Sequence, residues 1–127
     1  MGIHSDTDIY KATYSLLQYV MLLVKNMPRD FKQALGAELR DECIKITVLI
    51  LRANTAQDKT PHLSEIRERH QVVELLIRLS RDLKLISQRQ YAEAIEMTGS
   101  IGKQANGWLG FQRQTHEGQG HHDRALF

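Results

Sequence analysis

Cysteine and proline are scarce in this sequence: Cys43 stands alone, and Pro28 and Pro61 are the only prolines. A single cysteine cannot form an intrachain disulfide or a cysteine-based metal site, so the cysteine count favours a reducing, cytoplasmic compartment. Proline disrupts the interior of a helix but is tolerated in its first turn. Both prolines fall at breaks in the apolar pattern, which leaves long stretches free to form helices.

Long apolar runs and a strong excess of one charge are also absent. Charged residues interrupt every apolar stretch, so no run approaches the roughly 18 residues of a membrane span, and we expect no membrane association. The start of the chain, with Asp6 and Asp8, does not resemble a secretory signal. Seventeen Lys and Arg against 15 Asp and Glu give a net charge of +2. Any nucleic-acid contact therefore requires a local basic patch.

Hydrophobic residues make up 42% of the 127 positions and recur at helical spacing in four segments. The predicted helices span about 6–26, 29–54, 63–85 and from 88 onward. Ser5 or Asp6 is the expected cap of the first helix, and Ser87 that of the fourth. Four helices joined by three short connections, among them the polar segment 55–60, predict an all-α, antiparallel, up-down-up-down four-helix bundle.

The end of the chain differs in composition from the rest. Residues 115–127 are polar, contain three histidines and are interrupted by glycines. Such a composition is typical of a flexible extension, and a flexible segment loses conformational entropy for every ligand it orders around a metal. We therefore expect residues 1–114 to form the bundle and residues 115–127 to form a flexible C-terminal tail without a dedicated metal site.

The first and third predicted helices carry more apolar surface than one bundle core requires. In the third helix the apolar residues cover roughly 200° of the helical wheel, about twice the minimum for a core-facing stripe. Surplus apolar surface on a soluble protein is typical of an interface. We assign Leu75, Leu79 and Ile86 to an oligomer interface or to bundle packing. The alternative is that wide stripes bury more thoroughly in a small core.

Glycines gather in the fourth predicted helix, where each costs up to about 1 kcal/mol relative to alanine. Close approach of another backbone would offset this cost. Gly102, Gly107 and Trp108 are therefore further candidates for an interface or for packing within the bundle. Alternatively, the glycines fray the helix toward the tail.

Basic residues line one side of the third predicted helix, where Arg67, Arg78 and Arg81 share a face and Lys84 extends it. Arginine binds phosphate oxygens in a bidentate manner, so this face could follow a nucleic-acid backbone. Further candidates on the outward arcs of the other helices are Lys45, Arg52 and Lys103. The alternative is an ordinary solvated face, since Glu74 lies at ion-pair spacing before Arg78.

No arrangement of residues indicates catalysis. The sequence has no phosphate-binding Walker loop, no dinucleotide-binding glycine motif and no HExxH zinc motif. A di-iron bundle site needs inward-pointing Glu-x-x-His motifs, and Glu96 is followed by no histidine. We therefore expect a protein that is not an enzyme and that binds no metal or cofactor.

Short motifs along the chain resemble one family of helical proteins. The first half carries Met27-Pro28-Arg29, Leu35-Gly36 and Arg52-Ala53-Asn54. The second half carries Arg78-Leu79, Asp82-Leu83-Lys84, Ile86-Ser87, Gln90-Tyr91, Ile101-Gly102-Lys103 and Gly107-Trp108-Leu109. Their order and spacing from about Ile9 to Gln114 resemble the four-helix-bundle family that includes Avd of diversity-generating retroelements and the proteins encoded in 23S rRNA intervening sequences. The Ile-Gly-Lys and Gly-Trp motifs at the end favour the Avd branch.

The resemblance implies a non-catalytic accessory protein that assembles into a barrel-like homopentamer with a basic surface. It implies two partners, the retroelement reverse transcriptase and its template RNA, or the cDNA or RNA/DNA hybrid made from it. The implied role is mutagenic retrohoming, in which adenine-templated errors diversify a target gene. Asn106 departs from the family pattern, which often has a second glycine before the tryptophan. The alternative is a structural homo-oligomer of the 23S rRNA intervening-sequence type, with no reverse-transcriptase partner.

Overall fold

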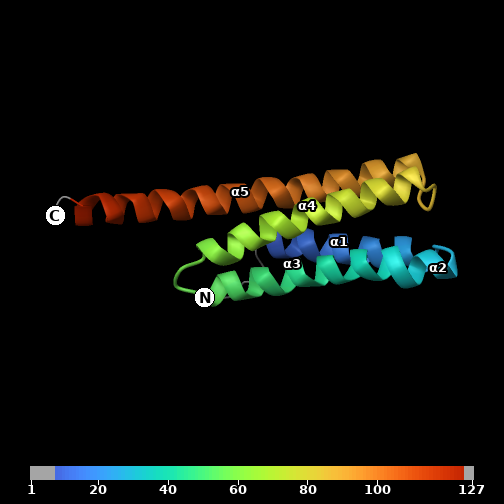
Figure 1. The fold of residues 1–127 in the computed structure, drawn as a ribbon. Helices are drawn as coiled ribbons and strands as arrows, with labels where there is room; N and C mark the ends of the chain where they lie inside the picture. The colour runs from blue at the N-terminus through green and yellow to red at the C-terminus, as the bar shows by residue number, and fades with distance from the viewer. Residues whose placement is uncertain (1–7, 125–127) are drawn as a thin grey trace.

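The computed structural model describes the backbone of residues 8–124 and the side chains of residues 8–111. This part of the chain is helical and contains no strand (Figure 1). Its elements are α1 (Asp8–Lys25), α2 (Arg29–Phe31), η2 (Lys32–Gly36), α3 (Ala37–Thr55), α4 (Thr60–Asp82) and α5 (Gln88–Arg124). Because α2, the π-helical η2 and α3 follow one another without a break, they form one rod, and the bundle has four long rods, as the sequence predicts.

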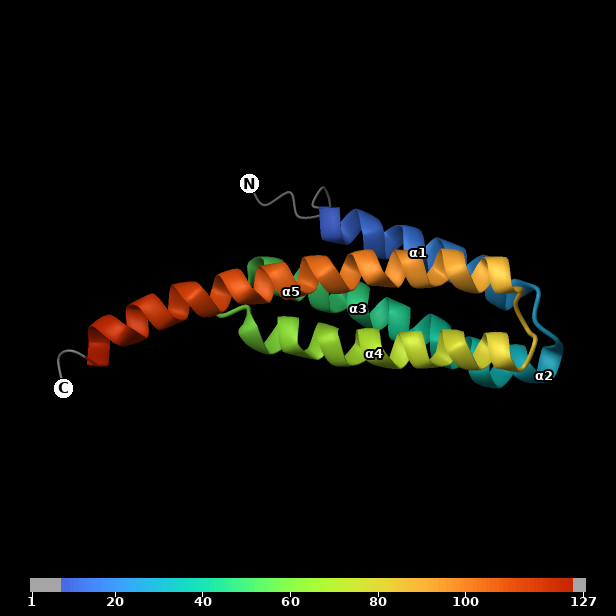
Figure 2. The same ribbon diagram turned by 90° about the horizontal axis from the view of Figure 1, so that it is seen from above.

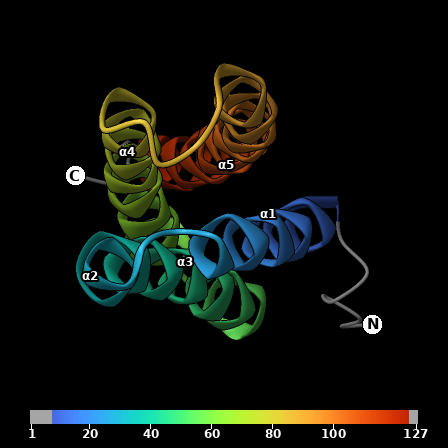
Figure 3. The ribbon, with the colours of Figure 1, turned by 90° about the vertical axis from the view of Figure 1, so that its right-hand side faces the viewer.

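The ribbon reverses direction at each of the three short connections (Figure 1). Seen along the bundle, the rods lie around one axis, with α4 and α5 on one side and α1 and α3 on the other (Figure 3). Helix α1 packs on α3 and α5, and α4 packs on the same two helices. Each rod therefore borders the rods next to it in the sequence, and α5 closes the bundle against α1.

One core fills the space between the rods. Its largest side chains recur at spacings of three, four and seven residues, which places them on one face of each helix. Burying each such aliphatic side chain contributes about 1.5–3 kcal/mol, so these stripes are the main source of stability. The fully buried residues include Leu16, Val20, Leu39, Ile46, Ile50, Leu63, Ile66, Ile77 and Ile101.

The start of α5 agrees with the predicted cap. The hydroxyl of Ser87 accepts a hydrogen bond from the backbone N–H of Gln90 at 3.0 Å, and the side-chain oxygen of Gln90 accepts one from the backbone N–H of Ser87 at 2.8 Å. This reciprocal pair is a capping box, which satisfies two backbone donors that a helix start leaves open. The caps expected at Ser5 and Asp6 lie outside the described residues.

The end of α4 was predicted too late in the chain. The helix ends at Asp82 rather than Leu85, because Lys84 adopts a left-handed conformation with φ 61°. The N–H of Leu85 donates to the carbonyl oxygen of Ser80, and that of Lys84 donates to the carbonyl oxygen of Arg81, both at 2.8 Å. These two bonds form a Schellman cap, in which glycine usually takes the left-handed position. A lysine there gives no sequence signal for the turn.

Gly36 ends the π-helical segment η2 and lies close to the end of α1. A Cβ added to Gly36 would stand 2.7 Å from Cγ1 of Val24 and 3.4 Å from Sδ of Met27, both on or just after α1. The missing side chain lets the end of α1 lie directly against η2. The resemblance motif Leu35-Gly36 therefore has a packing reason, since both residues are buried.

Helix α5 continues past Gln114 to Arg124, where a flexible tail was expected. Its last part extends beyond the other rods (Figure 2). A helix that is already formed extends at little cost, because each added residue gains a hydrogen bond without a new nucleation step. The division into a bundle of residues 1–114 and a tail of residues 115–127 stays a prediction. No helix in the described part of the chain is both long and apolar enough to cross a membrane.

Candidate nucleic-acid and partner interface

The predicted basic strip on α4 divides into cations that are free and a cation that is held. Arg67 and Arg78 are exposed, and neither forms an ion pair with another described side chain. Arg81, by contrast, stacks on the ring of Tyr91 with 4.1 Å between its Cζ and the ring centroid, and it pairs with Asp82 at 3.0 Å. A phosphate bound to Arg81 would have to compete with these contacts, so Arg78 is more available to a ligand than Arg81.

Glu74 does not pair with Arg78, although the spacing permits it. Its carboxylate Oε2 accepts a hydrogen bond of 2.8 Å from the hydroxyl of Thr98 and lies 3.6 Å from Nε2 of His70. The bond from Thr98 turns Glu74 toward α5, whereas His70 lies one turn earlier on α4 itself. The alternative i,i+4 ion pair with Arg78 is therefore replaced by one hydrogen bond to α5 and one contact within α4, and Arg78 is left without a carboxylate partner in the described region.

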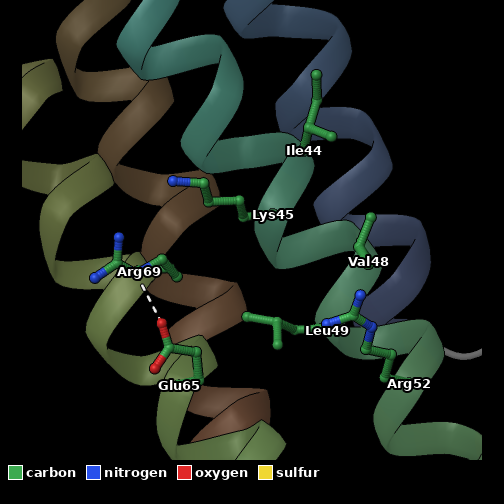
Figure 4. A pocket seen from close by; sticks show the side chains of 7 residues that line it. All are labelled: Ile44, Lys45, Val48, Leu49, Arg52, Glu65 and Arg69. Carbon is green, nitrogen blue, oxygen red and sulfur yellow. Dashed lines mark ion pairs between the residues drawn. The ribbon is translucent and has the colours of Figure 1, made fainter.

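Two more predicted cations, Lys45 and Arg52, line the same groove between α3 and α4, two helical turns apart on α3 (Figure 4). The groove has a volume of about 420 Å³, and its apolar wall consists of Ile44, Val48 and Leu49. Arg52 forms no ion pair with the described side chains, whereas Nζ of Lys45 lies 3.2 Å from Oε2 of Glu42. The groove thus combines an apolar wall with at least one uncompensated positive charge.

An ion pair between a buried carboxylate and a partly buried arginine of the groove wall was missed by the sequence analysis. Glu42 is only 1% exposed, and both its carboxylate oxygens accept from Nη1 of Arg69, at 3.0 and 3.1 Å. Nε of Arg69 lies 3.2 Å from Glu65 (Figure 4). Removing Arg69 would leave the buried Glu42 carboxylate with Lys45 as its remaining partner, so the cost lies below the roughly 3–5 kcal/mol of a fully broken buried pair.

A signal for this pair was present in the sequence. Glu42 lies three residues after Leu39 and four before Ile46, which puts it on the core face of its helix. Arg69 holds the same position relative to Ile66 and Val73. Two opposite charges at core positions of consecutive helices indicate a buried pair.

The remaining basic candidates lie apart from the groove. Lys84 is exposed in the turn after α4, and Lys103 is exposed on α5. Arg67 lines a second, smaller pocket between α4 and α5. The seven predicted cations therefore do not form one cluster on a single protomer. They divide among the α4/α5 side, the α3/α4 groove and the end of α4.

The predicted interface residues fall into an exposed group and a buried group. Leu75 and Leu79 are 58% and 41% exposed and lie one helical turn apart on α4, with the exposed Leu83 just beyond. Ile86, in contrast, is buried in the core, and Trp108 is partly buried against it. Only the leucines therefore leave apolar surface uncovered on the α4 side. On other helices, exposed large apolar side chains include Tyr14, Met21, Leu22, Ile44, Val48, Leu51 and Phe111.

The two glycine candidates have different surroundings. A Cβ on Gly102 would stand 3.0 Å from Nε2 and Cε1 of His70, whereas nothing lies within 4 Å of a Cβ on Gly107. The missing side chain of Gly102 therefore makes room for the His70 ring, whereas we expected the close approach of a neighbouring backbone. The open space beside Gly107 gives it no packing role within the protomer.

Comparison with protein families identifies the family to which the chain is similar. A family model described as bAvd-like matches residues 9–112, which include α1, the α2–η2–α3 rod, α4 and most of α5. No curated protein matches the chain. Within the described side chains, no three His, Cys, Asp or Glu residues gather as a metal site.

Proposed function

Because the chain belongs to the bAvd-like family, we propose that it is a non-catalytic accessory protein of a diversity-generating retroelement. In this proposal it binds the retroelement reverse transcriptase and its template RNA in the cytoplasm, and it supports mutagenic retrohoming, which diversifies a target gene. The single observation that carries the proposal is the outer side of α4, where the free Arg78 adjoins the exposed Leu75 and Leu79. Such a surface offers both phosphate-binding and protein-binding groups.

The RNA is held mainly through its phosphates. Arg67 and Arg78 support this, because they are exposed and have no carboxylate partner in the described region. Lys84, Lys103 and Arg52 add exposed positive charge at other places on the protomer. Phosphate contacts release counterions and carry no base information, so binding weakens steeply with salt and discriminates little among sequences.

The proposed active form is a ring of identical protomers, with five as the number that the family resemblance implies. Each protomer is an antiparallel up-down-up-down bundle. The exposed leucines of α4 and the exposed Met21 and Leu22 of α1 support the assembly, because apolar side chains left open on one protomer can be covered by another. A ring repeats the same few cations around its circumference, and this multivalency raises affinity for a long polyanion.

The alternative function is a purely structural homo-oligomer of the 23S rRNA intervening-sequence type. Such a protein would share the bundle and the exposed leucines but would have no reverse-transcriptase partner and no RNA. Binding to these two partners therefore distinguishes the two functions.

The test is co-purification of the chain with the reverse transcriptase encoded beside it, with and without the retroelement RNA. We expect the two proteins to elute together and the RNA to bind with a steep salt dependence. The test variant is Arg67→Gln with Arg78→Gln, which should keep the parental oligomeric mass but bind less RNA. If the parental protein binds neither the enzyme nor the RNA at low salt, the accessory function is wrong.

A further inference from the structure

A small polar pocket between α4 and α5 contains groups that the packing of the two helices does not use. Its volume is about 200 Å³. Helix α4 contributes Arg67, His70, Gln71 and Glu74 to its wall, and α5 contributes Gly102, Ala105 and Asn106. This volume is smaller than the roughly 300–1,000 Å³ of an ordinary small-molecule site, so the pocket suits one flat ring system.

Part of the pocket wall is rigid. Nε2 of His70 contacts the carbonyl oxygen of Thr98, so this nitrogen carries the proton and donates it. Thr98 is fully buried, and its hydroxyl donates to Glu74 at 2.8 Å. The imidazole and the carboxylate are thus held in place from α5. Gly102 and Ala105 line the α5 side of the pocket with small groups only.

The rest of the wall is unused. The side chains of Arg67, Gln71 and Asn106 have no hydrogen-bond or ion-pair partner among residues 8–111. Each amide offers a donor and an acceptor side by side, which matches the edge of a nucleobase. Arg67 is exposed at the pocket and offers the fork of donors that binds phosphate.

Glu74 narrows the class of ligand. A carboxylate in the wall repels a phosphate group from the interior, so an anion is bound only outside it, where Arg67 is exposed. The same carboxylate accepts hydrogen bonds from an exocyclic amino group, as acidic side chains do with the amino group of cytosine. Uracil presents a carbonyl oxygen at that position, which Glu74 disfavours.

We propose that this α4/α5 pocket binds one unpaired, amino-bearing nucleobase of a single-stranded RNA segment, with Arg67 on the adjoining phosphate. The inference rests on the proposed RNA binding and deepens it, because it adds one base-reading contact to a surface that otherwise reads only phosphates. A base in a duplex has its pairing edge occupied, so the pocket favours single strands, whose bases can be splayed out.

The test compares short oligocytidylate and oligouridylate RNAs, which differ in the group offered to Glu74. We expect the parental protein to bind the cytidine oligomer on the order of tenfold more tightly at one salt concentration. Glu74→Gln should abolish this preference, since an amide can donate as well as accept while still accepting from Thr98. Asn106→Ala should weaken binding of the cytidine oligomer, whereas Gln18→Ala, an exposed amide on α1, should leave it unchanged.

Two outcomes separate this inference from the proposed function. If RNA binds with a steep salt dependence but the two oligomers bind equally in the parental protein and in Glu74→Gln, the pocket assignment is overturned and the accessory function stands. If no RNA binds at all, the accessory function fails, and the pocket is tested alone by titrating cytidine and uridine monophosphate into isotope-labelled protein. Shifts of the Gly102 and Asn106 amides with the cytidine compound only would support the pocket, and equal or absent shifts would overturn it.

Discussion

The imidazole of His70 occupies the space that a side chain on Gly102 would need. A Cβ at Gly102 would stand 3.0 Å from both Nε2 and Cε1 of the ring, a distance at which the ring must move. Because the ring is held by the carbonyl oxygen of Thr98, movement would stretch that hydrogen bond. Glycine at position 102 is therefore explained by a contact between α4 and α5.

We expect Gly102→Ala to lower the free energy of unfolding by about 1 kcal/mol. The gain in helix propensity, up to about 1 kcal/mol, is outweighed by the crowded ring and the weakened hydrogen bond. Gly107→Ala is the matched control on the same helix, where nothing lies within 4 Å, and it should raise stability by about 0.4–1 kcal/mol. Urea denaturation measures both. Equal stabilisation by the two substitutions would show that the His70 contact is unimportant.

Lys84→Gly should raise the unfolding free energy by about 1 kcal/mol, because glycine adopts the left-handed conformation at φ 61° without the steric cost that lysine bears. The same change removes a proposed phosphate contact, so RNA affinity should fall while thermal stability rises. Lys84→Ala separates the effects, since it loses the charge and keeps the strained backbone. A Lys84→Gly protein no more stable than Lys84→Ala would contradict the prediction.

Arg78→Gln should reduce RNA affinity more than Arg81→Gln. Arg78 is exposed and has no ion-pair partner in the described region, whereas Arg81 is held by Tyr91 and Asp82. Each single-strand phosphate contact that is lost should lower the slope of log affinity against log salt by about 0.7. Filter binding across a salt series measures this, after light scattering has confirmed an unchanged mass. A larger effect at Arg81 would mean that RNA displaces Tyr91.

Replacing Leu75 and Leu79 together with serine should dissociate the oligomer without unfolding the protomer. Both side chains are exposed, and surface substitutions usually change stability by less than about 0.5 kcal/mol. Light scattering gives the mass and circular dichroism the helix content. Glu68→Ser, at an exposed polar position on the same helix, should keep the parental mass. A parental protein that is monomeric at micromolar concentration would exclude the proposed ring altogether.

Tyr19 should make stability fall at high pH. Burial, followed by the 2.7 Å hydrogen bond to Glu93, raises the pKa of Tyr19 from 10.0 to about 12. The neutral phenol is therefore favoured in the folded state. Its contribution to stability is fully present below pH 10 and is lost as the pH rises toward 12.

Urea unfolding between pH 8 and 12 tests this dependence. The stability difference between the parental protein and Tyr19→Phe should shrink across that range. Tyr14→Phe, at an exposed tyrosine, should show a difference that does not change with pH. Burial, and then Glu42, also raises the pKa of Cys43 to about 12, but this contribution is common to all three proteins and cancels in the comparison.

Periodicity predicted the four rods because each core stripe recurs every three or four residues, a property that belongs to single helices. The end of α4 could not be predicted in the same way. Lys84 adopts a left-handed conformation that glycine usually takes. The hydrogen bond from Leu85 to Ser80 that closes this turn is seen only in the structure. The approach of α1 to Gly36 is likewise a contact between two elements, which the pattern within one helix does not predict.

The candidate site was predictable in its residue types but not in their availability. The helical wheel places Arg78 and Arg81 on one face, yet whether either is free depends on α5, which brings Tyr91 to Arg81. Glu74 is similar, because its partner Thr98 lies on another helix. Pairings between helices decide which charges remain for a ligand, and a pattern within one helix contains no information about them.

The Glu42–Arg69 pair affects the alignment of α3 along α4. The core stripes of α3 and α4 both repeat every three or four residues, so a shift of one helix by a single turn would again face core positions with core positions. That shifted arrangement would bury Glu42 away from Arg69 and leave it only Lys45 of its own helix, which costs part of the roughly 3–5 kcal/mol of a broken buried pair. The pair thereby favours the observed alignment of α3 and α4 over shifted ones.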